Sequence, residues 1–180
     1  MIRSLAIVTA LLSFPAVALA QGCGPTRLKV VESVTLDVPA AEAWRLAGNF
    51  QDMSWAKNTT STVGSGGNEP EKALRKVTLG NGAVLEESLY RYDAQAMSYS
   101  YHIDRADTVV LPVQNASVTL EVVPVEGDTK STVRWRAAFY RFLRPDEPAA
   151  DSADAEAAKA VSTLARQMLA GLKGKMEAKT

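Results

Sequence analysis

The sequence predicts an α+β domain in which an antiparallel sheet of about seven strands packs against one long C-terminal helix. Residues 83–142 hold strand-like runs rich in β-branched and aromatic residues, separated by short turns. Residues 151–178 instead place apolar residues three and four positions apart, which is typical of an amphipathic helix. The sheet is the one partner available to bury that helix. A curved sheet wrapped round it would leave a cavity between the two.

Residues 27–38 predict the first strand, because their β-branched content is high. Pro39 ends this strand and suits the first position of a short helix over residues 40–50. Residues 51–57, QDMSWAK, are interpreted as a second short helix or turn that carries Trp55. The expected order therefore begins with a strand and two short helices.

Six further strands are predicted from apolar and β-branched runs bounded by turn residues. They cover residues 58–63, 72–79, 83–92, 97–102, 113–125 and 131–142. In the last strand, alternation predicts one buried face, made of Val133, Trp135, Ala137 and Phe139.

The long helix is expected over residues 151–178, where it would span roughly 40 Å at 1.5 Å per residue. Its apolar stripe consists of Ala157, Val161, Leu164, Ala165, Met168, Leu172 and Met176.

Residues 80–102 form the stretch that any site is expected to touch. They contain a Gly-Asn-Gly turn, the adjacent carboxylates Glu86 and Glu87, and four of the five tyrosines. Successive side chains on a strand point to opposite faces, so Glu86 and Glu87 are not expected to act as a catalytic pair.

The first 20 residues have the pattern of a secretory signal peptide, with Arg3, an apolar run and Ala18-Leu19-Ala20 as a cleavage site. The mature protein is therefore expected to be periplasmic or secreted. No second apolar run follows, so no transmembrane segment is predicted. Residues 21–26 are interpreted as a flexible tail, and residues 27–180 as the domain. Cys23, the sole cysteine, could be lipidated, but Gln21 disfavours that and favours an unpaired thiol.

The charge balance, 20 Lys and Arg against 20 Asp and Glu, does not indicate a nucleic-acid-binding protein. His102, Asp104 and Asp107 give only a weak metal-like pattern, because His102 is the one histidine. The sequence thus indicates neither a metal nor a cofactor. It also contains no convincing catalytic set, and whether the protein is an enzyme stays open.

The predicted order of elements over roughly residues 27–178 carries a resemblance to a known superfamily, and five runs between residues 24 and 141 carry a closer one. They are GPTRLKVVESVTLDVPAAEAW, GNFQDMSW, NGAVLEESLYRYDAQAMSYSYHI, VLPVQNASVTLEV and STVRWRAAFYR. The chain resembles the START-like superfamily, also called SRPBCC, which includes polyketide cyclases and has the helix-grip fold. Within it, the runs are most similar to MxaD-type periplasmic accessory proteins of methanol oxidation. Many superfamily members carry Trp-His-Pro where this chain has Trp55-Ala56-Lys57, so no role of that histidine carries over.

The resemblance implies a ligand cavity with a glutamate, here Glu87, pointing into it. A buried carboxylate needs a partner, and Arg136 matches another polar cavity position. The alternative is that Glu87 and Arg136 both face water, and strand alternation favours this for Arg136. The other implied lining residues are Tyr99 and Tyr101, Asn115 and Ser117 as polar wall residues, Trp55 near the mouth, and Met168 of the helix.

Three functional hypotheses follow from the resemblance. The first is an MxaD-like accessory protein that assists a periplasmic quinoprotein (methanol) dehydrogenase or its cytochrome, or binds a small hydrophobic ligand. The second is an enzyme of the polyketide cyclase/dehydratase kind, and the third is a lipid or quinone carrier. One fold hosts all three activities, so the fold does not separate them.

Overall fold

The computed structural model describes residues 26–143 and 150–178. The predicted signal peptide, Cys23 and nearly all of the predicted tail lie outside the described residues. The described chain contains seven strands and two α-helices, which confirms the predicted α+β class.

The elements follow one another in nearly the predicted order. The strands are β1 Leu28–Leu36, β2 Thr59–Ser65, β3 Leu74–Leu79, β4 Val84–Asp93, β5 Ser98–Ala106, β6 Val113–Val125 and β7 Lys130–Arg141. The helices are α1 Ala40–Ala47 and α2 Ala150–Glu177, and a single 3-10 turn, Glu126–Asp128, joins β6 to β7.

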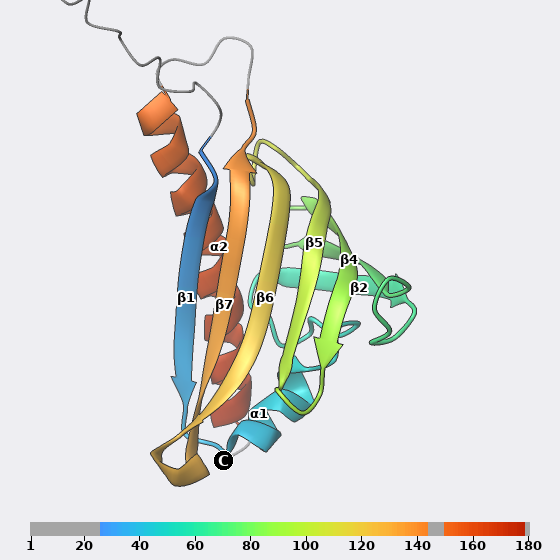
Figure 1. Cartoon of the computed structure of the whole chain (residues 1–180), viewed down its shortest axis with the longest axis vertical. Helices are drawn as coiled ribbons and strands as arrows, with labels where there is room; N and C mark the ends of the chain where they lie inside the picture. The colour runs from blue at the N-terminus through green and yellow to red at the C-terminus, as the bar shows by residue number, and fades with distance from the viewer. Residues whose placement is uncertain (1–25, 144–149, 179–180) are drawn as a thin grey trace, which may run out of the picture.

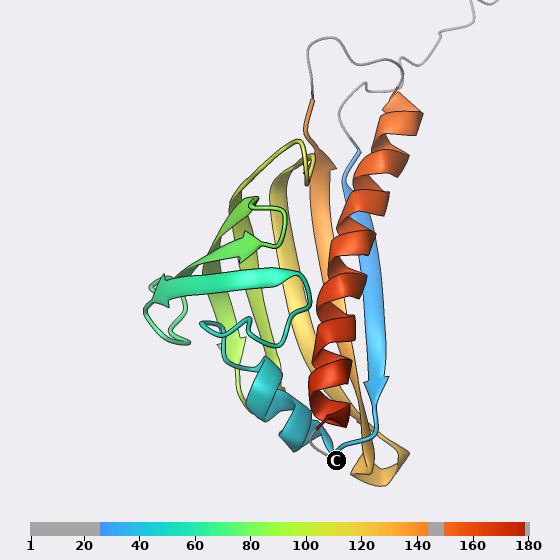
Figure 2. The same ribbon diagram turned by 180° about the vertical axis from the view of Figure 1, so that it is seen from behind.

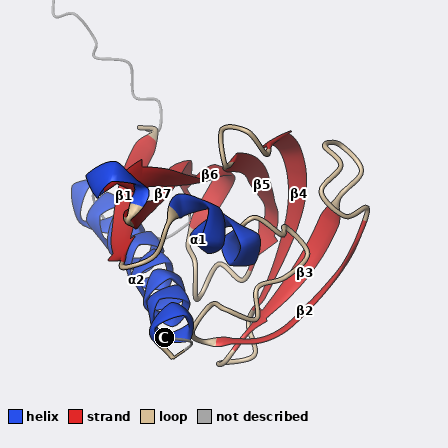
Figure 3. Ribbon diagram, turned by 90° about the horizontal axis from the view of Figure 1, so that it is seen from below, coloured by secondary structure: helices blue, strands red, loops and turns tan. Residues whose placement is uncertain are grey.

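All seven strands form one antiparallel sheet in the order β1-β7-β6-β5-β4-β3-β2. Only the pair β1–β7 connects strands that are distant in sequence; the others are successive hairpins. The sheet curves strongly, and α2 runs along its inner face beside β1 and β7 (Figure 1, Figure 2). Seen from below, the sheet turns from β1 round to β3 and β2, with α1 at the near end (Figure 3).

Residues 51–57 form successive turns, so the turn alternative predicted for them is confirmed and the second short helix is not. Two side chains accept hydrogen bonds from the backbone two residues further along and so close local turns. Asn49 Oδ1 accepts from the N–H of Gln51 at 3.0 Å, and Asp52 Oδ1 accepts from the N–H of Ser54 at 2.7 Å. Short Asn and Asp side chains compete with helix formation in this way.

The core lies between the sheet and α2. The stripe predicted for the long helix is buried, and so is the predicted face of β7 with Val133, Trp135, Ala137 and Phe139. Two ion pairs join α2 to the sheet, one in its first turns and one near its middle: Arg141 pairs with Asp154 at 2.8 Å, and Glu32 pairs with Arg166 at 2.9 Å. Neither described helix has the combination of length and hydropathy that a membrane span requires.

Gly171 allows α2 to approach the turn at residues 55–57, which generates a prediction. A Cβ at position 171 would lie 2.0 Å from the backbone nitrogen of Lys57, whereas a Cβ at Gly174 would meet nothing within 4 Å. We expect Gly171→Ala to lower the free energy of unfolding by about 1–3 kcal/mol, as overpacked sites do. Gly174→Ala should raise it by about 0.5–1 kcal/mol, because alanine is the better helix former.

Urea denaturation of the two variants measures both effects. If Gly171→Ala stabilised the protein as much as Gly174→Ala, the close approach of α2 to this turn would be contradicted.

Candidate functional site

A buried ion pair lies on the inner face of the sheet. Arg75 of β3 stands directly opposite Glu87 of β4, and Arg75 Nε donates to Glu87 Oε2 at 2.5 Å. The two side chains are 0 % and 3 % exposed. Alternation places Arg75 there, since Val77 and Leu79 on the same face are buried, whereas the neighbouring Lys76 is exposed. Removing both charges from water is costly, so this pair needs further hydrogen bonds to be stable.

Most of the Arg75 guanidinium is satisfied. Its Nη1 donates to the backbone oxygen of Phe50 at 2.7 Å, and its carbon lies 4.1 Å from the ring centre of Phe50 and 4.8 Å from that of Tyr101. Such cation–π contacts stabilise a desolvated guanidinium. Its Nη2, in contrast, has no hydrogen-bond partner among the described residues. The two N–H groups of this nitrogen therefore have no acceptor in hydrogen-bond geometry among the described residues, although the Tyr99 hydroxyl is near enough to interact with the guanidinium.

Two tyrosines of β5 border this pair. Tyr99 and Tyr101 are both buried, and the Tyr101 hydroxyl accepts from Trp135 Nε1 at 3.1 Å. Burial raises the pKa of both phenols, and the charge of Arg75 opposes the shift. Burial also raises the pKa of the Glu87 carboxyl, again opposed by Arg75. Both phenols thus stay protonated at neutral pH and can donate hydrogen bonds.

A groove of about 410 Å³ opens between α2, the β3–β4 turn and the β5–β6 loop; we call it the helix groove. Leu79, Leu111 and Leu164 form its apolar floor and belong to the buried core. Asn58 Nδ2 donates to Gln167 Oε1 at 3.2 Å and links the two sides. The remaining lining residues are Asn81, Val110, Glu156, Lys159, Ala160 and Thr163.

The helix groove and the buried ion pair are neighbours on the inner face. Arg75, Val77 and Leu79 occupy successive inward positions of β3, so the pair lies two inward positions beyond the groove floor. A molecule that entered over Leu79 would therefore approach Nη2 of Arg75.

A larger depression, of about 510 Å³, lies on the outer side of β2, β3 and β4. Val63, Leu74 and Lys76 are outward side chains of this region. Arg75 and Glu87 border it through their backbones only, because their side chains are 0 % and 3 % exposed. It therefore has no access to the interior polar groups.

Five of the predicted lining residues are buried in the interior: Glu87, Tyr99, Tyr101, Trp55 and Met168. Trp55 is only 1 % exposed, so it packs in the core rather than at an open mouth, and its Nε1 has no partner among the described residues.

The predicted pair of Glu87 with Arg136 is wrong. Arg136 follows the inward Trp135, so alternation turns it to the outer face, where it pairs with Glu121 at 3.0 Å. Asn115 and Ser117 also lie away from the interior. Asn115 is exposed in the bulge of β6 with a φ of 49°, and the Ser117 hydroxyl accepts from Arg27 at 3.1 Å.

Sequence reasoning missed Arg75, the actual partner of Glu87. The run Leu74-Arg75-Lys76 resembles a solvated strand. The signal that could have found Arg75 is its spacing of two from Ala73 and Val77, which are both buried.

Within residues 26–143 and 150–178, no three His, Cys, Asp or Glu side chains are grouped to hold a metal ion. His102 lies on the outer face and stacks on Tyr90, with ring centres 4.4 Å apart.

With this geometry established, comparison with known proteins identifies the family. Residues 27–177 match the family described as polyketide cyclase / dehydrase and lipid transport. The chain belongs to this family. No curated protein matches the chain.

Several solved structures share the fold. An uncharacterised protein of Bacillus thuringiensis is 21 % identical with a TM-score of 0.69, covering 83 % of this chain and 99 % of its own. A Nitrosospira multiformis protein is 26 % identical with a TM-score of 0.68, covering 85 % and 100 %. The Zhui aromatase/cyclase of Streptomyces sp. R1128 is 14 % identical with a TM-score of 0.67, covering 84 % and 94 %.

The buried ion pair generates a second prediction. Glu87→Gln leaves the Arg75 charge buried without its counter-ion, so we expect it to lower the free energy of unfolding by about 3–5 kcal/mol. The double variant Arg75→Met/Glu87→Leu removes both charges and should cost much less than the single change.

The adjacent pair Lys76–Glu86 is a matched control, since it joins the same two strands at 3.0 Å on the outer face. Glu86→Gln should change stability little, because exposed pairs contribute little. Chemical denaturation of the three variants measures the contrast. Equal effects of Glu86→Gln and Glu87→Gln would contradict the buried state of the inner pair.

Proposed function

We propose that this family member binds a small hydrophobic molecule between sheet and helix, with the helix groove as its way in. The observation that carries the proposal is the apolar floor of the groove, Leu79, Leu111 and Leu164, which continues into the core beneath a polar rim. Concave, mostly apolar sites with a few polar groups are typical of small-molecule binding.

The polar groups of the interior indicate what such a molecule carries. Arg75 Nη2 and Trp55 Nε1 are buried donors without a partner among the described residues, which is unfavourable unless an acceptor reaches them. An acceptor oxygen on the ligand would satisfy either donor. The proposed ligand class is therefore largely apolar with at least one carbonyl-type oxygen, which a quinone or ketone provides.

The proposed setting is the periplasm, in an MxaD-type accessory role beside a quinoprotein dehydrogenase or its cytochrome. Two features of the sequence support it. The first 20 residues have the pattern of a signal peptide, and residues 24–44, 81–103 and 131–141 carry the resemblance to MxaD-type proteins.

A cyclase-like enzyme is the second candidate, and the interior carboxylate favours it. The raised pKa of Glu87, beside two protonated phenols, is the kind of perturbation found at acid–base sites. An enzyme would convert its bound molecule, whereas a binding protein would release it unchanged. Mass spectrometry of the ligand before and after incubation separates the two.

The helix groove generates a third prediction. Thr163 is exposed on α2 and lines the groove, so Thr163→Trp places an indole across the opening. We expect binding of an apolar fluorescent probe such as 1-N-phenylnaphthylamine to weaken by about tenfold or more, which corresponds to about 1.4 kcal/mol.

Ala155→Trp is the matched control, because Ala155 is exposed on α2 outside the groove. It should leave probe affinity unchanged. If Thr163→Trp bound the probe as tightly as Ala155→Trp, the helix groove would not be the route by which the ligand enters.

The accessory role is tested by native mass spectrometry of the protein from its own periplasm, alone and mixed with a quinoprotein dehydrogenase of the same cell. A complex with the dehydrogenase, or a changed rate of electron transfer to cytochrome, is the expected result. A small molecule bound to the monomer, with no dehydrogenase complex and no rate change, would reject the accessory role and keep ligand binding.

A further inference from the structure

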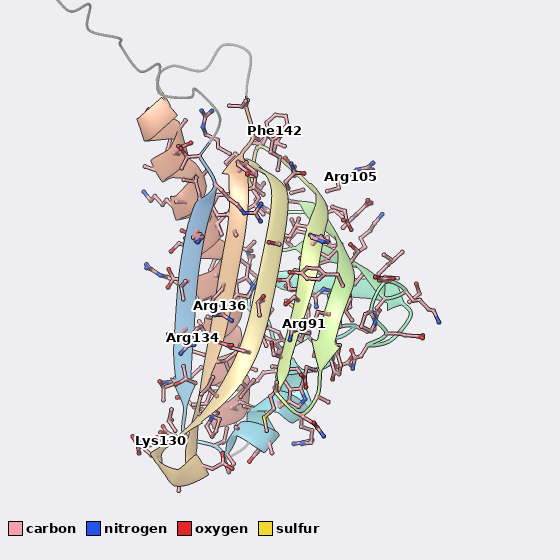
Figure 4. All side chains as sticks on the ribbon, viewed as in Figure 1. Arg91, Arg105, Lys130, Arg134, Arg136 and Phe142 are labelled. Carbon is pink, nitrogen blue, oxygen red and sulfur yellow. The ribbon has the colours of Figure 1, made fainter. Side chains whose placement is uncertain are left out.

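The outer face of the sheet forms an open, convex surface, because the sheet curves round the side on which α2 packs (Figure 3). Both described helices pack on the inner side, so β1, β7, β6, β5 and β4 present their outward side chains directly to solvent (Figure 4). Five adjacent strands extend over about 19 Å at the usual strand spacing. The helix groove opens on the other side of the sheet and shares no residue with this face.

Basic side chains gather at the middle of this face. Arg91, Arg134 and Arg136 all lie on it in Figure 4, and Lys29 is exposed on the outward side of β1. Strand register places these residues in three consecutive cross-strand rows. The rows are Lys29–Ala138–Ser117–His102, Val31–Arg136–Thr119–Ser100–Arg91 and Ser33–Arg134–Glu121–Ser98–Asp93. We call these three rows the outer-face patch.

The outer-face patch carries more positive than negative charge. Its four basic residues face two acidic ones, Glu121 and Asp93, although the whole chain is balanced. Asp93 accepts a hydrogen bond from the backbone of Ala96 in the following turn. The excess of positive charge is therefore confined to the outer-face patch. Such a patch attracts a partner through a complementary charged surface rather than through the net charge of the protein.

Glu121 holds the two central guanidinium groups in place. Its Oε1 accepts from Arg134 at 2.7 Å and its Oε2 from Arg136 at 3.0 Å. Both arginine side chains still expose more of their surface than Glu121 does: 41 % and 47 % against 19 %. An arginine fixed in this way loses less side-chain entropy when it binds a further carboxylate.

Short side chains surround these arginines. Ser100 and Thr119 occupy the row of Arg136 and hydrogen-bond to each other at 2.8 Å. Ser98, Ser117 and Ala138 lie in the neighbouring rows. The neighbouring side chains therefore do not prevent the carboxylates of a partner from reaching the guanidinium groups.

We propose that the outer-face patch docks a protein through an acidic surface on that partner. Guanidinium groups bind carboxylates through paired hydrogen bonds, which suits fixed arginines spaced two residues apart. A nucleic acid is disfavoured, because the patch has only four basic residues and the chain as a whole balances 20 basic against 20 acidic residues, whereas nucleic-acid-binding surfaces are strongly basic. This inference goes beyond the proposed function, since it requires neither a ligand in the groove nor a dehydrogenase.

The experiment measures binding of a short poly-L-glutamate chain to the full protein at low salt. We expect Arg134→Glu/Arg136→Glu to weaken binding by about tenfold or more, and added salt to weaken binding to the unchanged protein. Because that variant also removes both partners of Glu121, a second variant, Lys29→Glu/Arg91→Glu, tests the patch without touching Glu121 and should weaken binding as well.

Lys57→Glu/Lys173→Glu is the matched control, with the same change in net charge on the side of α2. It should leave poly-L-glutamate affinity within about twofold, since the patch rather than net charge attracts the partner. Equal weakening by the control, or tighter binding of single-stranded DNA through the same arginines, would overturn the proposal. Probe binding in the helix groove, measured on the same variants, should not change, so failure of this proposal is distinguishable from failure of ligand binding.

Discussion

The apolar stripe of α2 has to be buried, and the inner face of the sheet provides the surface that buries it. Val161, Ala165 and Leu172 of the helix are all buried against the sheet. A straight helix lies along a curved sheet at one side only, beside β1 and β7. The other half of the inner face, formed by β3, β4 and β5, is filled instead by large aromatic side chains and by the buried ion pair. This division separates a simple packing interface from the region that holds the interior polar groups.

In the half of the inner face formed by β3, β4 and β5, the cost of burying charge determines which side chains must pair. Arg75 and Glu87 are directly opposed across β3 and β4, and each needs the other to remain in an apolar interior. The guanidinium also fixes residues far along the chain, since it bonds the backbone of Phe50 and lies against the ring of Tyr101. One interaction thus holds the segment after α1, two neighbouring strands and the tyrosines of β5 together. The same arrangement leaves Nη2 without an acceptor in hydrogen-bond geometry among the described residues, and that donor gives the proposed ligand its polar requirement.

The two faces of the sheet divide the proposed activities. The inner face encloses apolar surface and a few polar donors, which suits a small molecule. The outer face is open, convex and locally basic, which suits a protein surface of opposite charge. Each strand contributes to both faces, because inward and outward side chains alternate along it. Arg136, for example, lies between Trp135 and Ala137 of the core.

Much of the architecture could be predicted from the sequence, because the spacing of apolar residues along the chain differs between a strand and a helix. Alternation in residues 131–142 and the three-to-four spacing in residues 151–178 predicted β7, α2 and their buried faces. The sequence left open whether residues 51–57 form a short helix or a turn, and the structure shows turns in which the side chains of Asn49 and Asp52 accept hydrogen bonds from nearby backbone N–H groups.

The sequence by itself determined the fold class, the burial of the α2 stripe and the opposite orientations of Glu86 and Glu87. Only the tertiary structure decided which residue pairs with Glu87. The sequence pointed to Arg136 alone and not to Arg75, because the partner depends on which strand lies next to β4 and in which register. Strand order and register are set by packing between segments distant in the chain. The alternation of side chains within one strand does not reveal which strand pairs with it or in which register.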